Sequence, residues 1–143
     1  MERWLWRSFV WHTWLVRVTR GRVGGRFGRL HFLLLHHVGA KSGAARTTPL
    51  LYHPMEDGSG YVIAGSRGGT AHNPAWVYNL RAQPDVEIEI PGEDRRRVVH
   101  AREVPEGEER ERLWALMVAD WRFFTSYQRR TRRRIPVFFL QPR

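Results

Sequence analysis

Residues 39–52 read GAKSGAARTTPLLY, a basic turn bounded by glycine that runs directly into an apolar segment. Two segments of similar character follow: residues 61–69 read YVIAGSRGG, and residues 73–80 read NPAWVYNL. Each segment places cations, hydroxyls or backbone N–H groups beside an expected strand or the start of an expected helix. A large anionic ligand with a flat ring needs such groups, because hydrogen bonds to charged oxygens are the strong ones. The three segments therefore predict one binding site assembled from separate parts of the chain.

The composition indicates one folded domain. The chain has 143 residues, of which 42% are hydrophobic, and it contains no cysteine, which excludes disulfides and thiol nucleophiles. The formal net charge of +10 would attract nucleic acid, an anionic membrane or an acidic ligand. Lys41 is the single lysine among 24 basic residues, so a codon bias toward arginine explains the charge equally well.

The hydrophobic patterns predict a mainly β protein. Continuous or alternating apolar segments indicate strands at residues 30–38, 46–53, 61–65, 86–90, 95–104 and 137–140. Helices are expected at residues 74–82, with Asn73 as the N-cap, and at 106–120 and 123–133. Such an order is typical of a small, mostly antiparallel barrel with peripheral helices.

The first 20 residues predict an amphipathic N-terminal helix, set apart from a barrel domain at residues 21–143. This helix is too short and too charged to span a bilayer, and it lacks a signal-peptide pattern, so a cytoplasmic protein is expected. Residues 1–18 would either contact the inner face of the cell membrane peripherally, or pack on the barrel or a second subunit. The sequence leaves the oligomeric state open between a monomer and a homodimer.

Several familiar motifs fail on inspection. Ala40 and Leu35 stand where a phosphate-binding P-loop would have its glycines before Lys41, and Ala64 replaces the first glycine of a nucleophile elbow. Adjacent His36 and His37 would point to opposite faces of a strand, so no metal site is expected. The arginines of residues 129–134 read as a solvated basic face, and no nucleic-acid partner is expected. Without an evident nucleophile, chemistry carried by a cofactor is the simplest enzyme hypothesis.

The order of the motifs resembles the deazaflavin-dependent nitroreductase family, whose members are actinobacterial split β-barrel proteins of the FMN-binding type. The resemblance rests on GxKSGxxRTTPL at residues 39–50, AGSRGG at 64–69 and NPxWxxNLxAxP at 73–84. It implies coenzyme F420, an 8-hydroxy-5-deazaflavin with a phosphate and an oligoglutamate tail, with FMN a less favoured ligand. It also implies a reductase that transfers a hydride to an electron-poor small molecule, such as a quinone or a nitroaromatic compound.

The resemblance also implies roles for individual residues. The residues expected to hold the phosphate and the anionic tail are Lys41, Ser42 and Arg46. Those expected along the ring are Thr48, Pro49, Leu50 and Leu51. Those expected to contact the deazaflavin from the glycine loop are Ala64, Gly65, Ser66, Arg67, Gly68 and Gly69, and those expected to close the pocket from the helix are Ala75, Trp76 and Asn79.

The late helices supply the expected substrate wall. In relatives with nitroreductase activity this wall is rich in tyrosine, whereas the matching positions here are Trp121, Phe124 and Tyr127. Tyr127 and Ser66 are the candidate catalytic residues, with Tyr127 orienting the substrate or relaying a proton. Two alternatives stay open: a non-catalytic binder of deazaflavin, flavin or fatty acid on the same fold, and a basic nucleic-acid protein.

Overall fold

The computed structural model describes residues 26–27 and 30–143. The predicted helix at residues 1–20 and the expected membrane contact of residues 1–18 lie outside the described residues. The elements in chain order are β1 (Arg26–Phe27), β2 (Leu30–Val38), β3 (Ala45–Pro54), β4 (Tyr61–Ala64), the short 3-10 helix η1 (Arg67–Gly69), α2 (Ala75–Ala82), β5 (Asp85–Glu89), β6 (Arg97–Glu103), α3 (Glu108–Asp120), α4 (Phe123–Arg130) and β7 (Val137–Pro142).

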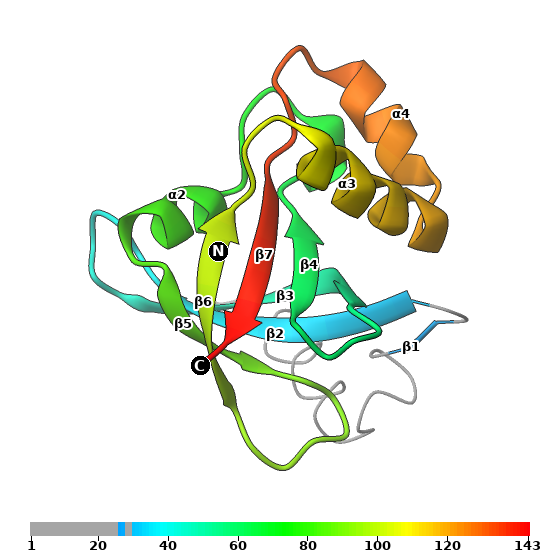
Figure 1. Ribbon diagram of the computed structural model, residues 1–143. Coiled ribbons are helices and arrows are strands. Elements are labelled where there is room, and N and C mark those ends of the chain that lie inside the picture. The colour runs from blue at the N-terminus through cyan, green and yellow to red at the C-terminus, as the bar shows by residue number, and fades with distance from the viewer. Residues whose placement is uncertain (1–25, 28–29) are drawn as a thin grey trace.

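The strands form one antiparallel sheet that closes on itself. Its order is β1-β2-β3-β4-β7-β6-β5, and β5 pairs back to β2 through Leu34–Glu89, Leu35–Ile88 and His36–Glu87. Six strands, β2 to β7, thus make a closed barrel, as Figure 1 shows. Closure pairs most of the strand edges that would otherwise invite pairing with other chains.

The join between β3 and β4 is the shortest in the barrel. Only two residue pairs link these strands, His53–Val62 and Pro54–Tyr61, whereas β2 and β3 share eight. Beyond His53 toward the start of β3, no described strand pairs with the second edge of residues 45–52. This unpaired edge leaves backbone groups of β3 available for a ligand.

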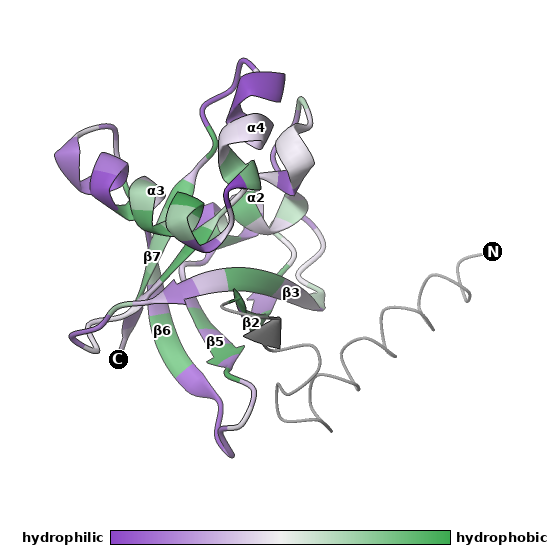
Figure 2. Cartoon of the chain, turned by 90° about the vertical axis from the view of Figure 1, so that its right-hand side faces the viewer, coloured by the Kyte–Doolittle hydropathy of each residue, from purple (hydrophilic) through white to green (hydrophobic). Residues whose placement is uncertain are grey.

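Two apolar cores lie on opposite sides of the barrel wall. The inner core includes Leu33, Leu35, Ile63, Phe138 and Leu140, and α2 covers it with Trp76, Val77 and Leu80. The outer core includes Val62, Val137, Leu113, Met117 and Phe124, and it joins α3 and α4 to the strands. Figure 1 shows α2 on one side of the barrel and α3 with α4 on another; in Figure 2 the part of α3 beside the strands is hydrophobic.

The predicted elements are present with small differences at their ends. The helix predicted at 123–133 ends at Arg130, and the last strand extends to Pro142. The predicted Asn73 cap is wrong: Pro74 occupies the cap position of α2 and no side chain caps this helix, because the Asn73 side chain bonds Arg133 instead. Within the described part of the chain, no helix is long and apolar enough to cross a membrane.

Candidate functional site

The basic turn between β2 and β3 exposes its cations. Hydrogen bonds from Gly39 N to Ala44 O and from Gly43 N to Gly39 O, both 2.9 Å, close the turn, and Gly43 adopts a φ of 70°. Lys41, Ser42 and Arg46 are all exposed there. No acidic side chain of the described residues pairs with either cation. The turn therefore holds two uncompensated positive charges, as an anionic ligand requires.

A buried chain of polar side chains ties this turn to α2 and β3. The Ala40 N–H donates to Asn79 Oδ1 at 2.8 Å, Asn79 Nδ2 lies 2.9 Å from His37 Nδ1, and His37 Nε2 lies 2.8 Å from Thr48 Oγ1. Burial, reinforced by the charge of Arg46, lowers the pKa of His37 to about 4. His37 is therefore neutral near pH 7, and Asn79 serves to hold the turn in place.

The loop after β4 is held from behind by Arg133. Its guanidinium donates to the carbonyl oxygens of Gly65 (3.0 Å), Ser66 (2.8 Å) and Thr70 (2.9 Å) and to Asn73 Oδ1 (2.6 Å). In a trans peptide the N–H points opposite to the C=O. Since Arg133 binds the carbonyls of residues 65 and 66, the N–H groups of residues 66 and 67 point away from it.

Three successive residues of the loop have positive φ: Arg67 (42°), Gly68 (64°) and Gly69 (81°). Ser66 before them is right-handed helical, and such an alternation of hand is typical of backbone anion-binding sites. The Gly69 N–H is not available for a ligand, because it donates to Ser66 O at 2.8 Å. Arg67 itself is exposed and has no acidic partner among the described residues. The loop thus combines backbone donors with a free cation.

Glycine is needed where this loop packs against its neighbours. A side chain at Gly69 would come within 2.5 Å of the backbone oxygen of Tyr127 in α4, and one at Gly65 within 2.7 Å of Val77 in α2. The loop can approach both helices only because these two residues lack a Cβ. The predicted Tyr127 is thereby brought against the predicted glycine loop.

The predicted substrate wall is assembled by α4 and the end of α3. Trp121 Nε1 donates to Tyr127 Oη at 3.2 Å, and Phe124 packs edge-on to the Tyr127 ring at 5.9 Å between centroids. Leu51 and Ala64 pack on the same outer core as Trp121 and Tyr127. Phe124 is itself buried, so it lies behind Tyr127 and supports it.

Some predicted residues do not share one face. Because side chains alternate along a strand, Thr48 and Leu50 face the interior side of β3, where Leu50 packs on the inner core, whereas Leu51 packs on the outer core. Residues 48–51 therefore do not all present their side chains to one ligand face. Trp76 is buried in the inner core against Phe138, with ring centroids 5.7 Å apart, while Ala75 is exposed.

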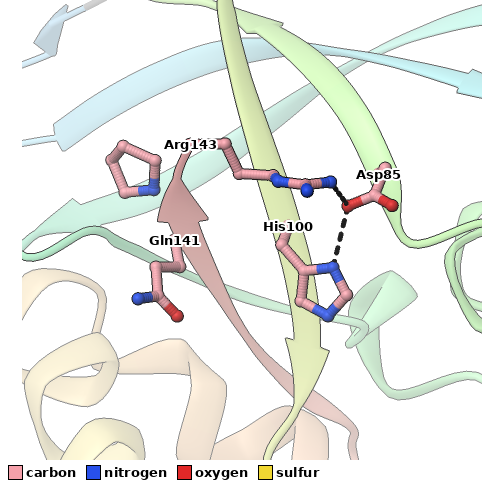
Figure 3. Close-up of a pocket in the computed structure, with 5 residues that line it drawn as sticks. Asp85, His100, Gln141 and Arg143 are labelled. Atoms are coloured by element: carbon pink, nitrogen blue, oxygen red, sulfur yellow. Dashed lines mark hydrogen bonds and ion pairs between the residues drawn. The ribbon is translucent and has the colours of Figure 1, made fainter.

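A separate open pocket lies at the start of β5, the middle of β6 and the end of β7. It is lined by Asp85, His100, Gln141, Pro142 and Arg143. His100 Nδ1 and Arg143 Nη1 each lie 2.8 Å from Asp85 Oδ1, as Figure 3 shows. Its one carboxylate, Asp85, is already shared by His100 and Arg143, and no predicted site residue contributes to this pocket.

Two residues that organise the site were missed from the sequence. His37 reads as an ordinary strand residue, and Arg133 falls within a run of arginines expected to be solvated. That expectation is wrong for Arg133, which is half-buried against four acceptors. No local signal in this run of arginines distinguishes Arg133 from its neighbours.

Comparison with known proteins agrees with this architecture. Residues 8–142 match the model of a family described as F420H(2)-dependent quinone reductase. The chain is 41% identical over 134 residues to an F420H(2)-dependent quinone reductase of Mycobacterium tuberculosis, covering 92% of this chain and 88% of that protein. Among solved structures it is similar to the F420-H2 dependent reductase FDR-A, with a TM-score of 0.67, 37% identity, and 77% of this chain and 93% of that chain covered.

A second solved structure, described as a domain-swapped dimer, has a TM-score of 0.66 and 34% identity, with 90% of this chain and 98% of that chain covered. The predicted barrel and the predicted use of a deazaflavin are both confirmed by these matches. From its closed barrel, its ordered motifs and these similarities, the chain belongs to the F420H(2)-dependent quinone reductase family.

Proposed function

We propose that the basic turn, the unpaired edge of β3 and the loop at residues 64–69 bind coenzyme F420 together, and that the acceptor is a quinone. The observation that carries this proposal is the pair of uncompensated cations, Lys41 and Arg46, on a turn fixed to α2 beside the unpaired edge of β3. Family membership supports the identity of the cofactor.

The residues present fit such a cofactor. Lys41, Arg46 and the Ser42 hydroxyl would hold phosphate and carboxylate oxygens, for which fixed cations are the strongest partners. The loop offers the N–H groups of Arg67 and Gly68, whereas the Gly69 N–H already donates to Ser66 O, and Gly68 permits close approach because glycine carries no side chain. Leu51 and Ala64 supply an apolar surface beside these donors.

When bound in its reduced form, coenzyme F420 supplies a hydride to an electron-poor acceptor. Reduction of a quinone to a hydroquinone also takes up a proton at oxygen. Tyr127 accepts a hydrogen bond from Trp121, so its own hydroxyl proton is directed elsewhere and can be donated to a quinone oxygen. Arg67 would stabilise negative charge on that oxygen, and the aromatic wall would exclude water and position the acceptor.

The wall favours a quinone over a nitroaromatic substrate. It contains one phenol, Tyr127, beside the indole of Trp121 and the buried ring of Phe124. A mostly apolar aromatic surface suits a flat, weakly polar quinone ring. A nitro group would require more hydroxyl donors than this wall offers.

The first test is titration of the full chain with coenzyme F420, followed by cofactor fluorescence, with FMN as the control. Binding of the deazaflavin alone, followed by oxidation of the reduced coenzyme with a soluble quinone, is the expected result. Binding without turnover of any quinone or nitroaromatic compound would favour a non-catalytic binder. Faster turnover of nitroaromatic compounds than of quinones would contradict the assignment of the acceptor.

We also propose that residues 1–20 form a unit separate from residues 21–143, and that residues 1–18 contact the membrane peripherally. The tryptophans and arginines of residues 1–18 are of the type found at a lipid headgroup surface. Deletion of these residues should abolish binding to anionic vesicles and leave coenzyme affinity unchanged. Light scattering of the same two proteins would distinguish a monomer from a homodimer.

A further inference from the structure

The direction of every hydrogen bond in the buried chain from Ala40 to Thr48 follows from its first member. A backbone N–H can only donate, so Asn79 Oδ1 is the acceptor from Ala40 at 2.8 Å. The amide nitrogen of Asn79 must then be the group that faces His37 Nδ1 at 2.9 Å, and it donates to that atom. His37 Nδ1 therefore carries no proton.

A neutral imidazole that accepts at Nδ1 carries its proton on Nε2. His37 is 4% exposed, and its environment keeps it neutral, since burial lowers its pKa to about 4. His37 Nε2 consequently donates to Thr48 Oγ1 at 2.8 Å. The Thr48 oxygen is an acceptor in this bond, and its own proton must be directed away from His37.

None of the described residues accepts that remaining proton of Thr48. The side chain is half-buried, and on β3 it lies two residues from Arg46, on the same face of the strand. Arg46 is also close enough to His37 for its charge to help lower the His37 pKa. The free hydroxyl proton thus lies in the region where the uncompensated cations of the turn would hold an anionic ligand.

We infer that Thr48 is a hydrogen-bond donor to an oxygen of the bound coenzyme, and that His37 and Asn79 are positioning residues that fix it in this role. The inference rests on the proposed function and names one contact of that site. The same series of hydrogen bonds gives the buried His37 a role behind the basic turn. Without it, the Thr48 hydroxyl could rotate to accept a hydrogen bond and would lose its direction.

The test compares coenzyme F420 affinity of full-length variants. Thr48→Val, which keeps the shape, should weaken binding about tenfold, whereas Thr48→Ser should restore it to within about twofold. Thr47→Val is a comparison variant on the opposite face of the strand, where the Thr47 hydroxyl bonds His36, and it should weaken binding less than Thr48→Val. His37→Phe should weaken binding in the wild-type background and have no further effect when combined with Thr48→Val.

Nitrogen-15 NMR of the ligand-free protein gives an independent readout. The expected result is a neutral His37 with its proton on Nε2; a proton on Nδ1 would overturn the inference. If the wild type binds coenzyme F420 and Thr48→Val binds it equally well, the inference is also overturned. The same holds if the effects of Thr48→Val and His37→Phe on affinity add in full. If the wild type fails to bind coenzyme F420, the proposed function falls together with this contact.

Discussion

Arg133 donates a 2.6 Å hydrogen bond to Asn73 Oδ1, across sixty residues of sequence. The same guanidinium binds three backbone carbonyls of the intervening loop, so one side chain fixes the segment between β4 and α2. No carboxylate of residues 26–27 or 30–143 contributes to this arrangement, and the positive charge of Arg133 lies directly behind the proposed anion site. Arg133 is therefore a positioning residue for the loop and not a surface charge.

Replacing Arg133 should disorder the donors of that loop. We expect Arg133→Gln to weaken coenzyme F420 binding by about tenfold or more, because four hydrogen bonds are lost or rearranged. Arg132→Gln is the matched control, since Arg132 is exposed and makes no side-chain bond to a described residue. Added guanidinium ion should partly restore binding to Arg133→Ala; equal losses for Arg132 and Arg133 variants would contradict the role.

Lys41 can be probed chemically, because it is the single lysine of the chain. An amine acylating reagent should modify Lys41 and the terminal amino group alone. Saturating coenzyme F420 should protect Lys41 and leave the terminal amine reactive, as mass spectrometry of the labelled peptides would show. Lys41→Ala should weaken binding about tenfold, through loss of a charge-assisted bond. Equal labelling with and without coenzyme would argue that the lysine lies outside the site.

Gly69 should tolerate substitution poorly. Gly69→Ala combines a φ of 81° with a contact at 2.5 Å to the backbone of Tyr127. Gly58→Ala is the matched control, because Gly58 has a φ of 75° and open space around it. We expect a loss of about 1–2 kcal/mol in unfolding free energy for Gly58→Ala and at least about 1 kcal/mol more for Gly69→Ala. Chemical denaturation measures both losses. Indistinguishable losses would show that the contact of Gly69 with the Tyr127 backbone does not restrict this position.

Tyr127 should affect turnover more than cofactor affinity. Tyr127→Phe removes the hydroxyl that Trp121 orients, so we expect kcat with a quinone to fall about 10- to 100-fold. The dissociation constant of coenzyme F420 should change less than about twofold. Tyr78→Phe serves as the control, since Tyr78 is 47% exposed on α2. A loss of affinity without a loss of kcat would assign Tyr127 to the cofactor instead.

The stability of the fold should depend on pH through His37. Its pKa in the folded chain is about 4, below the ordinary value of 6.5, so the unfolded chain takes up this proton at higher pH. The stabilising contribution is complete above pH 6.5 and is lost as the pH falls toward 4. From about pH 7 to about pH 5, the wild type should lose about 2 kcal/mol relative to His37→Gln. A constant difference between the two proteins would show that His37 does not titrate in this way.

The strands and helices could be predicted because their signals are local. The apolar segment at residues 32–35 of β2 and the alternation of Val86 and Ile88 with polar residues in β5 each indicate a strand without reference to the rest of the fold. The order of the glycine and proline motifs indicated the family for the same reason. Barrel closure through β2 and β5 was expected only as a class of fold, since the register depends on residues fifty positions apart.

The support of the site could not be predicted from local signals. Arg133 and Asn73 are far apart in sequence, and nothing in a run of arginines distinguishes the one that turns inward. Strand alternation could have warned that Thr48 and Leu51 face different sides of β3. The connection of His37 to Asn79 depends on where α2 lies over the barrel, which only the folded structure defines.

The two-pair join between β3 and β4 gives the barrel one place where it can open locally. Pro54 has no amide proton, so this join holds few backbone hydrogen bonds, while every neighbouring join is longer. Those amide protons of Tyr61–Ala64 that point toward β3 should therefore exchange with deuterium through small openings that leave β2 and β3 paired. A ligand that contacts both β3 and the loop after β4 would bridge this join, and amide exchange in β4 would slow when the ligand binds.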